Sequence, residues 1–174
     1  MPPLLILRHG QTVWNREGRL QGGRDSDLTA FGRVQAARQG AILRALGVAT
    51  RPVRVSPARR TQVSAALAGL SAEVENRIAE MGLGDWEGRS LAEIAPPRGV
   101  AWKFAAPGGE TRGALTARLA AFLASLDGPV IVVTHGVVSI GLRAMLMGVS
   151  DWDMLADPQG VVHHVEDGHE TVYA

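Results

Sequence analysis

The pattern of apolar and polar positions along the chain predicts strands that alternate with helices. Short apolar runs bounded by turn residues are typical of buried strands, and they occur at Pro3 to Leu7, Val53 to Val55 and Val130 to Thr134. Between these runs, apolar residues recur with helical spacing. We expect four main helices, from a Thr29 cap to about Leu46, from Pro57 to about Leu70, from Glu110 to Leu126 and from Gly136 to about Met147.

Weaker signals complete the predicted elements. We expect the apolar face of the first helix to carry Val34, Ala37, Ala41 and Ala45, a short helix to begin at Ser90, and further strands at Val74 to Ile78, Val161 to Val165 and Thr171 to Tyr173. Asp167-Gly168 is typical of a hairpin turn between the last two strands. Polar, glycine-rich or proline-rich segments predict loops at Gly10 to Leu28, Gly82 to Arg89 and Pro96 to Gly109. This alternation predicts one α/β domain over residues 1–174, a three-layer α/β/α sandwich with a mainly parallel sheet.

Candidate chemistry lies directly after the predicted strands. The segments concerned are Arg8-His9-Gly10, Ser56 to Arg60 and Thr134-His135-Gly136. Ligands of parallel α/β sheets bind where strands end and helices begin. We therefore expect two histidines and at least one arginine to meet at one edge of the sheet.

These residue types suit the handling of a phosphate group. The planar guanidinium of Arg8 can bind two phosphate oxygens, a neutral His9 imidazole can attack phosphorus, and Gly10 lets a ligand approach closely. Gly136 opens a helix whose N-terminal N–H groups favour an anion. Either histidine alone also fits a ring that is hydrogen-bonded within a loop, but two at matching positions favour a shared site.

Two further residues remain ambiguous on chemistry alone. Arg59 and Arg60 are neighbours on a helix and point about 100° apart, so only one of them can face the site. Glu80 precedes a glycine-rich loop. Its carboxyl could protonate a leaving alkoxide if its pKa were raised, and it fits a surface residue equally well.

Composition excludes several classes of protein. The chain has 174 residues, of which 46% are hydrophobic and 20% charged, and this balance indicates a globular protein rather than a disordered one. With a net charge of +1, no overall field attracts nucleic acid or a membrane. The absence of cysteine excludes disulfides, thiolate metal sites and a cysteine nucleophile. The apolar N-terminal run is too short for a signal peptide or a membrane span, so we expect a cytoplasmic protein. Lys103 is the only lysine.

A metal site is an alternative that the C-terminal histidines raise. His163, His164 and His169 lie close to Asp167 in the sequence. No His-Glu-x-x-His pattern occurs, however, and the segment coincides with a predicted hairpin. We therefore expect no metal ligands and no cofactor.

Taken together, the motifs resemble those of the histidine phosphatase superfamily, in the branch similar to cofactor-dependent phosphoglycerate mutase. The resemblance covers roughly Leu4 to Met147. It rests on the following blocks: Arg8-His9-Gly10-Gln11-Thr12, Trp14-Asn15, Leu20-Gln21-Gly22, Asp25, Leu28-Thr29, Gly32, Gln35-Ala36, Ser56-Pro57-x-x-Arg60, Glu80 with Gly84-x-Trp86-Glu87-Gly88, Pro107-Gly108-Gly109-Glu110 and Thr134-His135-Gly136. The departures, among them Gln11, Ala58 and Thr111, fall outside the proposed catalytic positions.

The resemblance implies a phosphoglycerate mutase-like fold and a role for each matching residue. His9 would be the nucleophile that becomes phosphohistidine, and Glu80 the general acid and then the base. Arg8, Arg60 and His135 would hold the phosphoryl oxygens, which selects Arg60 over Arg59. Asn15 would contact the phosphate, and the remaining predicted substrate-binding residues are Gln21, Gly22 and Gly136. Members of the family need no metal ion.

The resemblance also leaves alternatives for the reaction. We expect a phosphoric monoester hydrolase of the histidine acid phosphatase type, because only Arg89 to Ala106 separates the Glu80 block from Pro107-Gly108-Gly109-Glu110. That segment is short for covering the bisphosphorylated substrate of a mutase. The alternatives are a cofactor-dependent phosphoglycerate mutase and a non-catalytic phosphate-binding regulatory module. The expected partner is a small phosphomonoester, such as a phosphosugar or an α-ribazole phosphate-like compound, at a pocket mouth shaped by Arg16, Arg19, Arg24, Trp102 and Phe104.

Overall fold

The computed structural model describes residues 1–174 and contains a six-stranded sheet in the order β3-β2-β4-β1-β5-β6. The strands are β1 (Leu4–Arg8), β2 (Val53–Val55), β3 (Glu73–Val74), β4 (Val130–Thr134), β5 (Val162–Glu166) and β6 (His169–Tyr173). The four strands from β3 to β1 are parallel to one another, whereas β5 and β6 run antiparallel to their neighbours. The sheet is therefore mainly parallel, as the sequence predicts.

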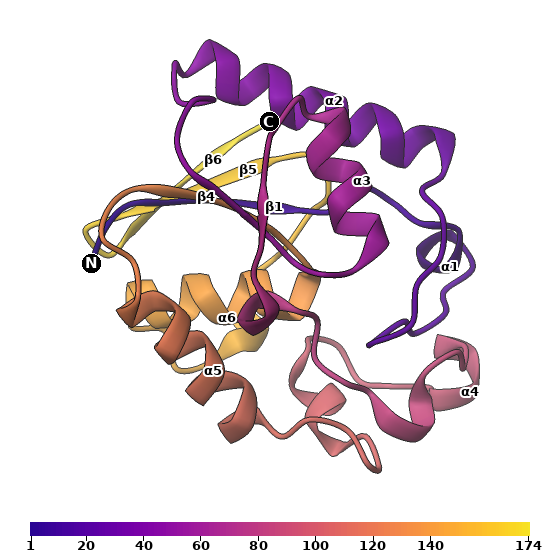
Figure 1. Ribbon diagram of the computed structural model, residues 1–174. Coiled ribbons are helices and arrows are strands. Elements are labelled where there is room, and N and C mark those ends of the chain that lie inside the picture. The colour runs from indigo at the N-terminus through magenta and orange to yellow at the C-terminus, as the bar shows by residue number, and fades with distance from the viewer.

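Helices cover both faces of this sheet, which gives three layers (Figure 1). One face carries α2 (Ala30–Ala45) and α3 (Arg59–Leu67), and the other carries α5 (Arg112–Ala124) and α6 (Gly136–Met147). Two single-turn helices, α1 (Val13–Arg16) and α4 (Leu91–Ile94), lie beyond the carboxyl end of β1, at the right of Figure 1. Short 3-10 turns occupy Asn76–Ile78, Gly84–Trp86, Ala101–Ala105 and Trp152–Met154. None of the helices combines the length and apolarity that crossing a membrane requires.

The alternation of side chains along β1 builds the two cores. Leu4 and Ile6 pack into a cluster of 20 buried residues with α5 and α6, and Leu5 and Leu7 pack into a cluster of 11 with α2 and α3. Successive strand residues point to opposite faces, so a strand buried on both sides reads as a continuous apolar run. The central strands are thereby packed on both faces, and their carboxyl ends lie at one edge of the sheet.

The predicted apolar face of α2 was wrong. Val34, Ala37, Ala41 and Ala45 are all exposed, and the buried positions are Gly32, Ala36, Gln39, Gly40 and Leu43. The reason is close packing of backbones. A Cβ on Gly32 would lie 2.0 Å from the Gln11 carbonyl oxygen, and one on Gly40 would lie 2.1 Å from that of Ala68. The helix therefore buries its smallest residues, which an apolarity pattern does not detect.

Other predicted boundaries need smaller corrections. The helix predicted from Pro57 begins at Arg59 with Ala58 as its N-cap, and the strand predicted over Val74 to Ile78 is only the two residues of β3 followed by a 3-10 turn. The three predicted loops contain short helical turns. The Thr29 cap of α2 and the helix start at Ser90 are confirmed, because each hydroxyl accepts a hydrogen bond from a backbone N–H three residues later.

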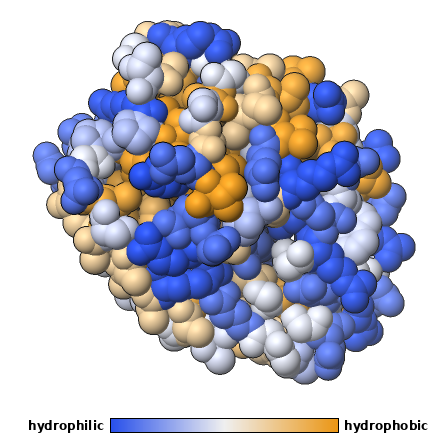
Figure 2. Space-filling view, in the orientation of Figure 1, coloured by the Kyte–Doolittle hydropathy of each residue, from blue (hydrophilic) through white to orange (hydrophobic).

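Polar and apolar residues are unevenly distributed on the face of the molecule in Figure 2. Most of the strongly hydrophobic residues gather in the upper part, around and below α2, whereas the centre and the lower right are mainly hydrophilic. Phe31 and Val34 of α2 contribute exposed apolar surface.

Candidate active site

Strand register places the two predicted site histidines next to each other. In the parallel pair β1–β4, Arg8 lies opposite Thr134, so that His9 and His135 both follow at the carboxyl edge of the sheet. The His9 N–H donates to the Thr134 carbonyl (3.0 Å), which continues the ladder by one residue. The two imidazole rings lie edge to face with centroids 5.3 Å apart.

A cleft with about 460 Å³ of free space opens over this edge. Eight of the nine predicted site residues line it, namely Arg8, His9, Asn15, Gln21, Gly22, Arg60, Glu80 and Gly136. His135 is the ninth and is fully buried behind the cleft wall. Tertiary structure thus brings together residues from the ends of β1 and β4, the start of α3, the loop after α1 and the segment after β3.

The His9 ring is prepared to act as a neutral nucleophile. Its Nδ1 lies 2.8 Å from the Gly10 carbonyl oxygen, which can only accept, so we assign the proton of the neutral ring to Nδ1. The lone pair of Nε2 is then free. Burial lowers the pKa of His9 well below its usual value, and the Arg8 and Arg60 guanidinium groups lower it further.

Arg60 is buried and anchored through its terminal nitrogens. Nη1 donates to the Arg24 carbonyl (2.7 Å) and to Asp25 Oδ1 (3.1 Å), and Nη2 donates to the Gly22 carbonyl (3.0 Å). Nε makes no hydrogen bond within the protein. A guanidinium has five N–H donors, so the parallel Nε–H and remaining Nη2–H stay free on one edge. That edge can bind two phosphate oxygens.

Arg8 is likewise anchored through a terminal nitrogen. Its Nη1 donates to the Asp157 carbonyl (2.8 Å) and lies 3.6 Å from Asp157 Oδ2. Nε is buried without a partner. The guanidinium packs against the start of α6, where a Cβ on Gly136 would lie 3.3 Å from its Cζ. Glycine at position 136 therefore makes room for Arg8 as well as opening the helix.

His135 is held by one ring nitrogen. Its Nε2 lies 2.6 Å from Ser56 Oγ, and its buried Nδ1 has no partner. Burial lowers the pKa of His135 well below its usual value, with a further contribution from Arg60, so the ring is neutral when the cleft holds no anion. An adjoining phosphate would favour the charged form. Contact between His135 and a phosphoryl oxygen stays a prediction, because His135 is fully buried in this structure.

Glu80 is placed by two segments that are distant in sequence. The Thr134 hydroxyl donates to the Ile78 carbonyl (2.8 Å), which ties the chain before Glu80 to the end of β4. After Glu80, the N–H of Glu110 donates to the Gly82 carbonyl (2.8 Å). A Cβ on Gly84 would lie 2.1 Å from the Pro107 carbonyl oxygen, so only glycine allows this approach. The Pro107-Gly108-Gly109-Glu110 block therefore supports the loop that carries Glu80.

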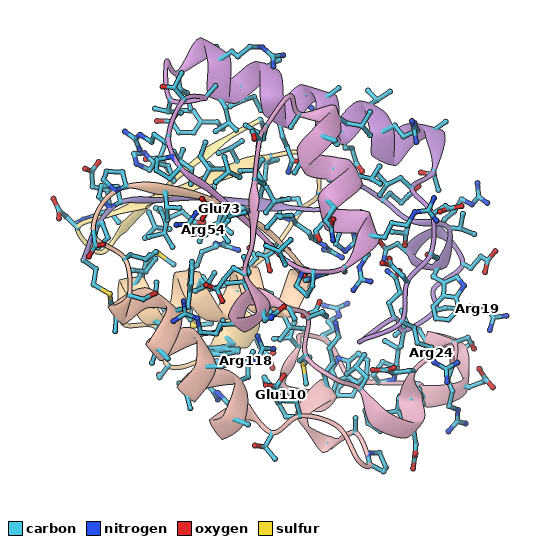
Figure 3. The ribbon with its side chains drawn as sticks, viewed as in Figure 1. Arg19, Arg24, Arg54, Glu73, Glu110 and Arg118 are labelled. Carbon is cyan, nitrogen blue, oxygen red and sulfur yellow. The ribbon has the colours of Figure 1, made fainter.

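An ion pair continues this support toward α5. Arg118 Nε and Nη2 donate to the two carboxylate oxygens of Glu110 at 2.7 and 2.8 Å, and Nη1 donates to the Arg77 carbonyl. Figure 3 shows Arg118 and Glu110 close together at α5, with Arg54 and Glu73 as a second pair at the sheet edge. Arg118 thus connects the segment before Glu80 to the block after it.

The neutral polar residues of the cleft have free donors. Asn15 Oδ1 accepts from the Thr12 N–H and from Gln159 Nε2, each at 3.2 Å, so its side-chain NH₂ group remains available. Gln21 is buried, and its Oε1 accepts from the Ser26 hydroxyl (3.1 Å), which leaves its NH₂ group available too. These amides add neutral donors beside the two guanidinium groups.

Comparison with known proteins identifies the family. The family model described as the histidine phosphatase superfamily (branch 1) matches residues 4–166, which is most of the chain. This chain belongs to the histidine phosphatase superfamily. The block that carries His9 and the block that carries His135 both lie inside the matched range.

Relatives of this protein are named as phosphatases and as mutases. It is 34% identical over 179 residues to a glucosyl-3-phosphoglycerate phosphatase of Mycobacterium tuberculosis, covering 87% of this chain and 79% of that protein. It is 40% identical to an acid phosphatase of the same species over 111 residues, which cover 62% of this chain and 55% of the relative. A probable phosphoglycerate mutase of Salmonella paratyphi B is 31% identical, with 87% and 78% covered.

Solved structures confirm the phosphoglycerate mutase-like fold of this protein. The product of open reading frame Rv3214 of Mycobacterium tuberculosis superposes with a TM-score of 0.84 at 31% identity, covering 99% of this chain and 96% of that one. A putative α-ribazole-5′-phosphate phosphatase of Escherichia coli superposes with a TM-score of 0.79 at 27% identity, covering 98% and 94%.

Sequence reasoning missed several residues around the cleft. Lys103 lines it from the Ala101–Ala105 turn, and burial lowers the pKa of this lysine. The one sequence signal that could have pointed to Lys103 is that it is the only lysine in an arginine-rich chain. Arg19 lines the cleft as expected for the pocket mouth, whereas Arg16, Arg24, Trp102 and Phe104 do not.

Other missed residues act behind the cleft. The Ser64 hydroxyl accepts from the Gly10 N–H (3.1 Å) and donates to the Arg60 carbonyl (2.8 Å), and so joins the loop after β1 to α3. Gln159 Nε2 donates to the His9 carbonyl (3.0 Å) as well as to Asn15. Neither residue has a sequence signal, because each acts through a contact with a distant segment.

The C-terminal histidines do not converge. His163 is buried, with Nδ1 2.7 Å from Glu170 Oε1, whereas its neighbour His164 points to the other face of β5 and lies near Glu166. His169 Nδ1 lies 2.9 Å from the Asp167 carbonyl oxygen in the hairpin turn. Alternation along a strand separates adjacent residues, so these side chains do not form the metal-ligand cluster considered above.

Proposed function

We propose that the protein is a metal-independent phosphatase that hydrolyses a small phosphate monoester through a phosphohistidine on His9. The observation that carries the proposal is the free Nε2 of a neutral His9, flanked in one cleft by the unpartnered donor edges of Arg8 and Arg60. Membership of the histidine phosphatase superfamily and relatives named as phosphatases support it. The domain over residues 1–174 carries all of the proposed site residues.

In the first step, His9 Nε2 attacks phosphorus in line with the ester oxygen. The N–P bond forms as the P–O bond to the alcohol breaks, and the leaving oxygen takes a proton from the Glu80 carboxylic acid. The free edges of Arg8 and Arg60, the amide of Asn15 and a protonated His135 stabilise the charge on the phosphoryl oxygens. Placement and preorganised charge of this kind supply most of the catalysis in phosphoryl transfer.

In the second step, water replaces the alcohol. The Glu80 carboxylate takes a proton from a water molecule whose oxygen attacks phosphorus opposite His9. The P–N bond breaks and its electron pair returns to Nε2, so inorganic phosphate leaves and Glu80 is again protonated. In this scheme the positive charge that a metal ion could supply comes from two guanidinium groups at fixed positions.

The phosphatase is favoured over the mutase by the segment between Glu87 and Pro107. It consists of α4, a five-residue 3-10 turn and their connections, and contributes only Lys103 to the cleft. A mutase must hold a second phosphate and shield the phosphoenzyme from water. The likeness to a probable phosphoglycerate mutase keeps that reaction as the second candidate. A non-catalytic module would lack His9 or Glu80, and both are present.

The composition of the cleft lining supports a polar substrate. Four of its 14 lining residues are hydrophobic, and its cations outnumber its single carboxylate, Glu80. This lining suits a phosphorylated sugar or a nucleoside-like monoester better than an apolar ester. Relatives named for glucosyl-3-phosphoglycerate and α-ribazole-5′-phosphate fall in that class.

The deciding experiment is hydrolysis of p-nitrophenyl phosphate in EDTA between pH 5 and 8. Activity that persists in EDTA and disappears in His9→Ala supports a metal-independent phosphohistidine mechanism. Loss of activity in EDTA that added metal restores would overturn metal independence. If well-folded protein shows no hydrolysis, isomerisation of 3-phosphoglycerate in the presence of 2,3-bisphosphoglycerate tests the mutase.

A further inference from the structure

A buried network of charged side chains lies directly behind Arg8. The Asp157 carboxylate, with 3% of its side chain exposed, sits between Arg8 of β1 and Arg143 of α6. Its Oδ1 accepts from the Ser139 hydroxyl at 2.6 Å and lies 3.4 Å from Arg143 Nη1. Its Oδ2 makes no hydrogen bond and is 3.6 Å from Arg8 Nη1.

The far side of this network holds Arg143 in place. Arg143 Nε and Nη2 donate to the two oxygens of Glu170 at 2.6 and 3.1 Å, and Nη1 donates to the Ala156 carbonyl (2.9 Å). His163 also contacts Glu170. Two guanidinium groups thus face two carboxylates, so the buried charges balance. The Asp157 carboxylate is fixed by Ser139 and Arg143, neither of which contacts the cleft.

Both clamp arginines place Nη1 between a backbone carbonyl and a carboxylate, but only Arg60 hydrogen-bonds its carboxylate. Arg60 Nη1 meets a backbone carbonyl, from Arg24, and a carboxylate, from Asp25. Arg8 Nη1 meets the backbone carbonyl and the carboxylate of a single residue, Asp157. In both arginines Nη1 is anchored, and Nε has no hydrogen-bond partner in the protein. A long side chain needs such an anchor, because a misplacement of about 1 Å can cost about a hundredfold in rate.

We propose that Asp157 is the positioning residue for Arg8, and that its buried carboxylate and backbone carbonyl together turn the free edge of the guanidinium into the cleft. Asp157 does not touch the phosphate and acts only through Arg8. The inference rests on the proposed function in taking Arg8 as a phosphate ligand. In this proposal, the cluster of Asp157, Ser139, Arg143, His163 and Glu170 serves to hold the Asp157 carboxylate beside Arg8.

Asp157→Asn tests the carboxylate, since it keeps the side-chain shape and the backbone carbonyl. We expect kcat/KM for p-nitrophenyl phosphate to fall about 10- to 100-fold, mostly through kcat. The matched control is Asp127→Asn, an exposed aspartate of the α5–β4 loop without a hydrogen bond, and it should stay within about twofold. If the carboxylate only opposed the positive cleft, Asp157→Asn would bind inorganic phosphate more tightly at unchanged kcat, and that result would overturn the proposal.

A double-mutant cycle with Arg8→Ala separates positioning from a structural role. Once Arg8 is absent, Asp157→Asn should change kcat/KM by less than about twofold, because it has nothing left to position. An equal loss in the two backgrounds means that Asp157 acts independently of Arg8 and refutes the inference. The same four proteins can be compared by calorimetric titration with inorganic phosphate, which measures the Kd of each. The test therefore stands even if the wild-type protein proves inactive as a phosphatase.

Ser139→Ala provides a second route if Asp157→Asn does not fold. It retains the charge of Asp157 and removes the hydrogen bond to Oδ1. We expect about a threefold to tenfold loss in kcat/KM that again disappears in the Arg8→Ala background. An unchanged kcat/KM in folded Ser139→Ala, or a loss that persists without Arg8, would count against the proposal.

Discussion

The rings of His9 and His135 lie edge to face, 5.3 Å apart, at the ends of two adjacent parallel strands. The register of the parallel strands brings the two rings together, because His9 follows Arg8, His135 follows Thr134, and Arg8 and Thr134 are paired across β1 and β4. His9 faces the cleft, and His135 lies behind it against Ser56. Although the two histidines follow matching strand ends, His9 lines the cleft and His135 is buried next to it.

Replacement of the proposed nucleophile should remove activity without unfolding the protein. We expect His9→Ala to lower kcat for p-nitrophenyl phosphate at least about a thousandfold. The exposed His169 of β6 offers a matched control, and His169→Ala should keep kcat within about twofold. Steady-state kinetics and circular dichroism check both variants. Retention of full activity in folded His9→Ala would refute the phosphohistidine mechanism.

Stability should decline on mild acidification. Burial lowers the pKa of His9, His135 and His163 below the usual value of 6.5. At a pH between the folded and the unfolded pKa of such a histidine, the unfolded state binds more protons than the folded state. The free energy of unfolding therefore keeps its full value above about pH 6.5 and decreases as the pH falls below it. The decrease is at most about 1.4 kcal/mol per pH unit for each histidine. Urea unfolding at pH 5.5, 6.0, 6.5 and 7.5 measures the slope.

The contribution of one histidine to this slope can be isolated. His9→Gln removes a titrating group, so the pH dependence below pH 6.5 should become shallower by up to about 1.4 kcal/mol per pH unit. The comparison at pH 7.5, where the His9 ring is neutral in both states, controls for the change in packing. An identical slope in His9→Gln and wild type would show that His9 is not a low-pKa group.

Proton transfer by Glu80 should depend on the leaving group. Glu80→Gln should slow the hydrolysis of alkyl monoesters, whose alkoxides need a proton, by about 100-fold or more, and that of p-nitrophenyl phosphate much less. Glu166→Gln on the exposed side of β5 is the control. Rates with a series of esters of increasing leaving-group pKa measure the difference. Equal losses across the series would exclude Glu80 as the acid.

Close backbone packing at the site should make one glycine irreplaceable. A Cβ on Gly10 would lie 2.0 Å from the Gly32 carbonyl oxygen, so Gly10→Ala must displace α2 or the His9 loop and should destabilise by about 2–4 kcal/mol. Gly113 of α5 has nothing within 4 Å of such an atom. Gly113→Ala should therefore stabilise by about 0.5–1 kcal/mol. Thermal and urea unfolding measure the stability of both variants. A Gly10→Ala variant as stable as the wild type, or a destabilised Gly113→Ala variant, would contradict the prediction.

Lys103 should contribute to substrate binding from the cleft wall. Lys103→Met is expected to raise KM for phosphate monoesters about fivefold to tenfold with a smaller effect on kcat, because it removes one positive charge near the phosphate. As the only lysine, it can also be acylated selectively apart from the N-terminus. Inorganic phosphate should protect it from acylation, and an unchanged labelling rate would place Lys103 away from the bound anion.

The sequence by itself determined the order of the main elements and the edge of the sheet at which the candidate site residues meet. Continuous apolar runs marked β1 and β4, since strands buried on both faces consist mostly of apolar residues. The residues that follow those strands were sufficient to predict where His9 and His135 meet. The family motifs then distinguished Arg60 from Arg59, and the structure places Arg60 in the cleft and leaves Arg59 exposed.

Only the tertiary structure decided which surfaces are buried and what supports the site. The buried face of α2 consists of small residues, because backbones that approach to contact distance exclude larger ones, and apolarity alone pointed to the opposite face. The anchors of Arg8 and Arg60, the setting of His135 behind the cleft and the presence of Lys103 in it all depend on contacts between distant segments. Such contacts are set by the packing of the whole chain, and no local sequence pattern encodes them.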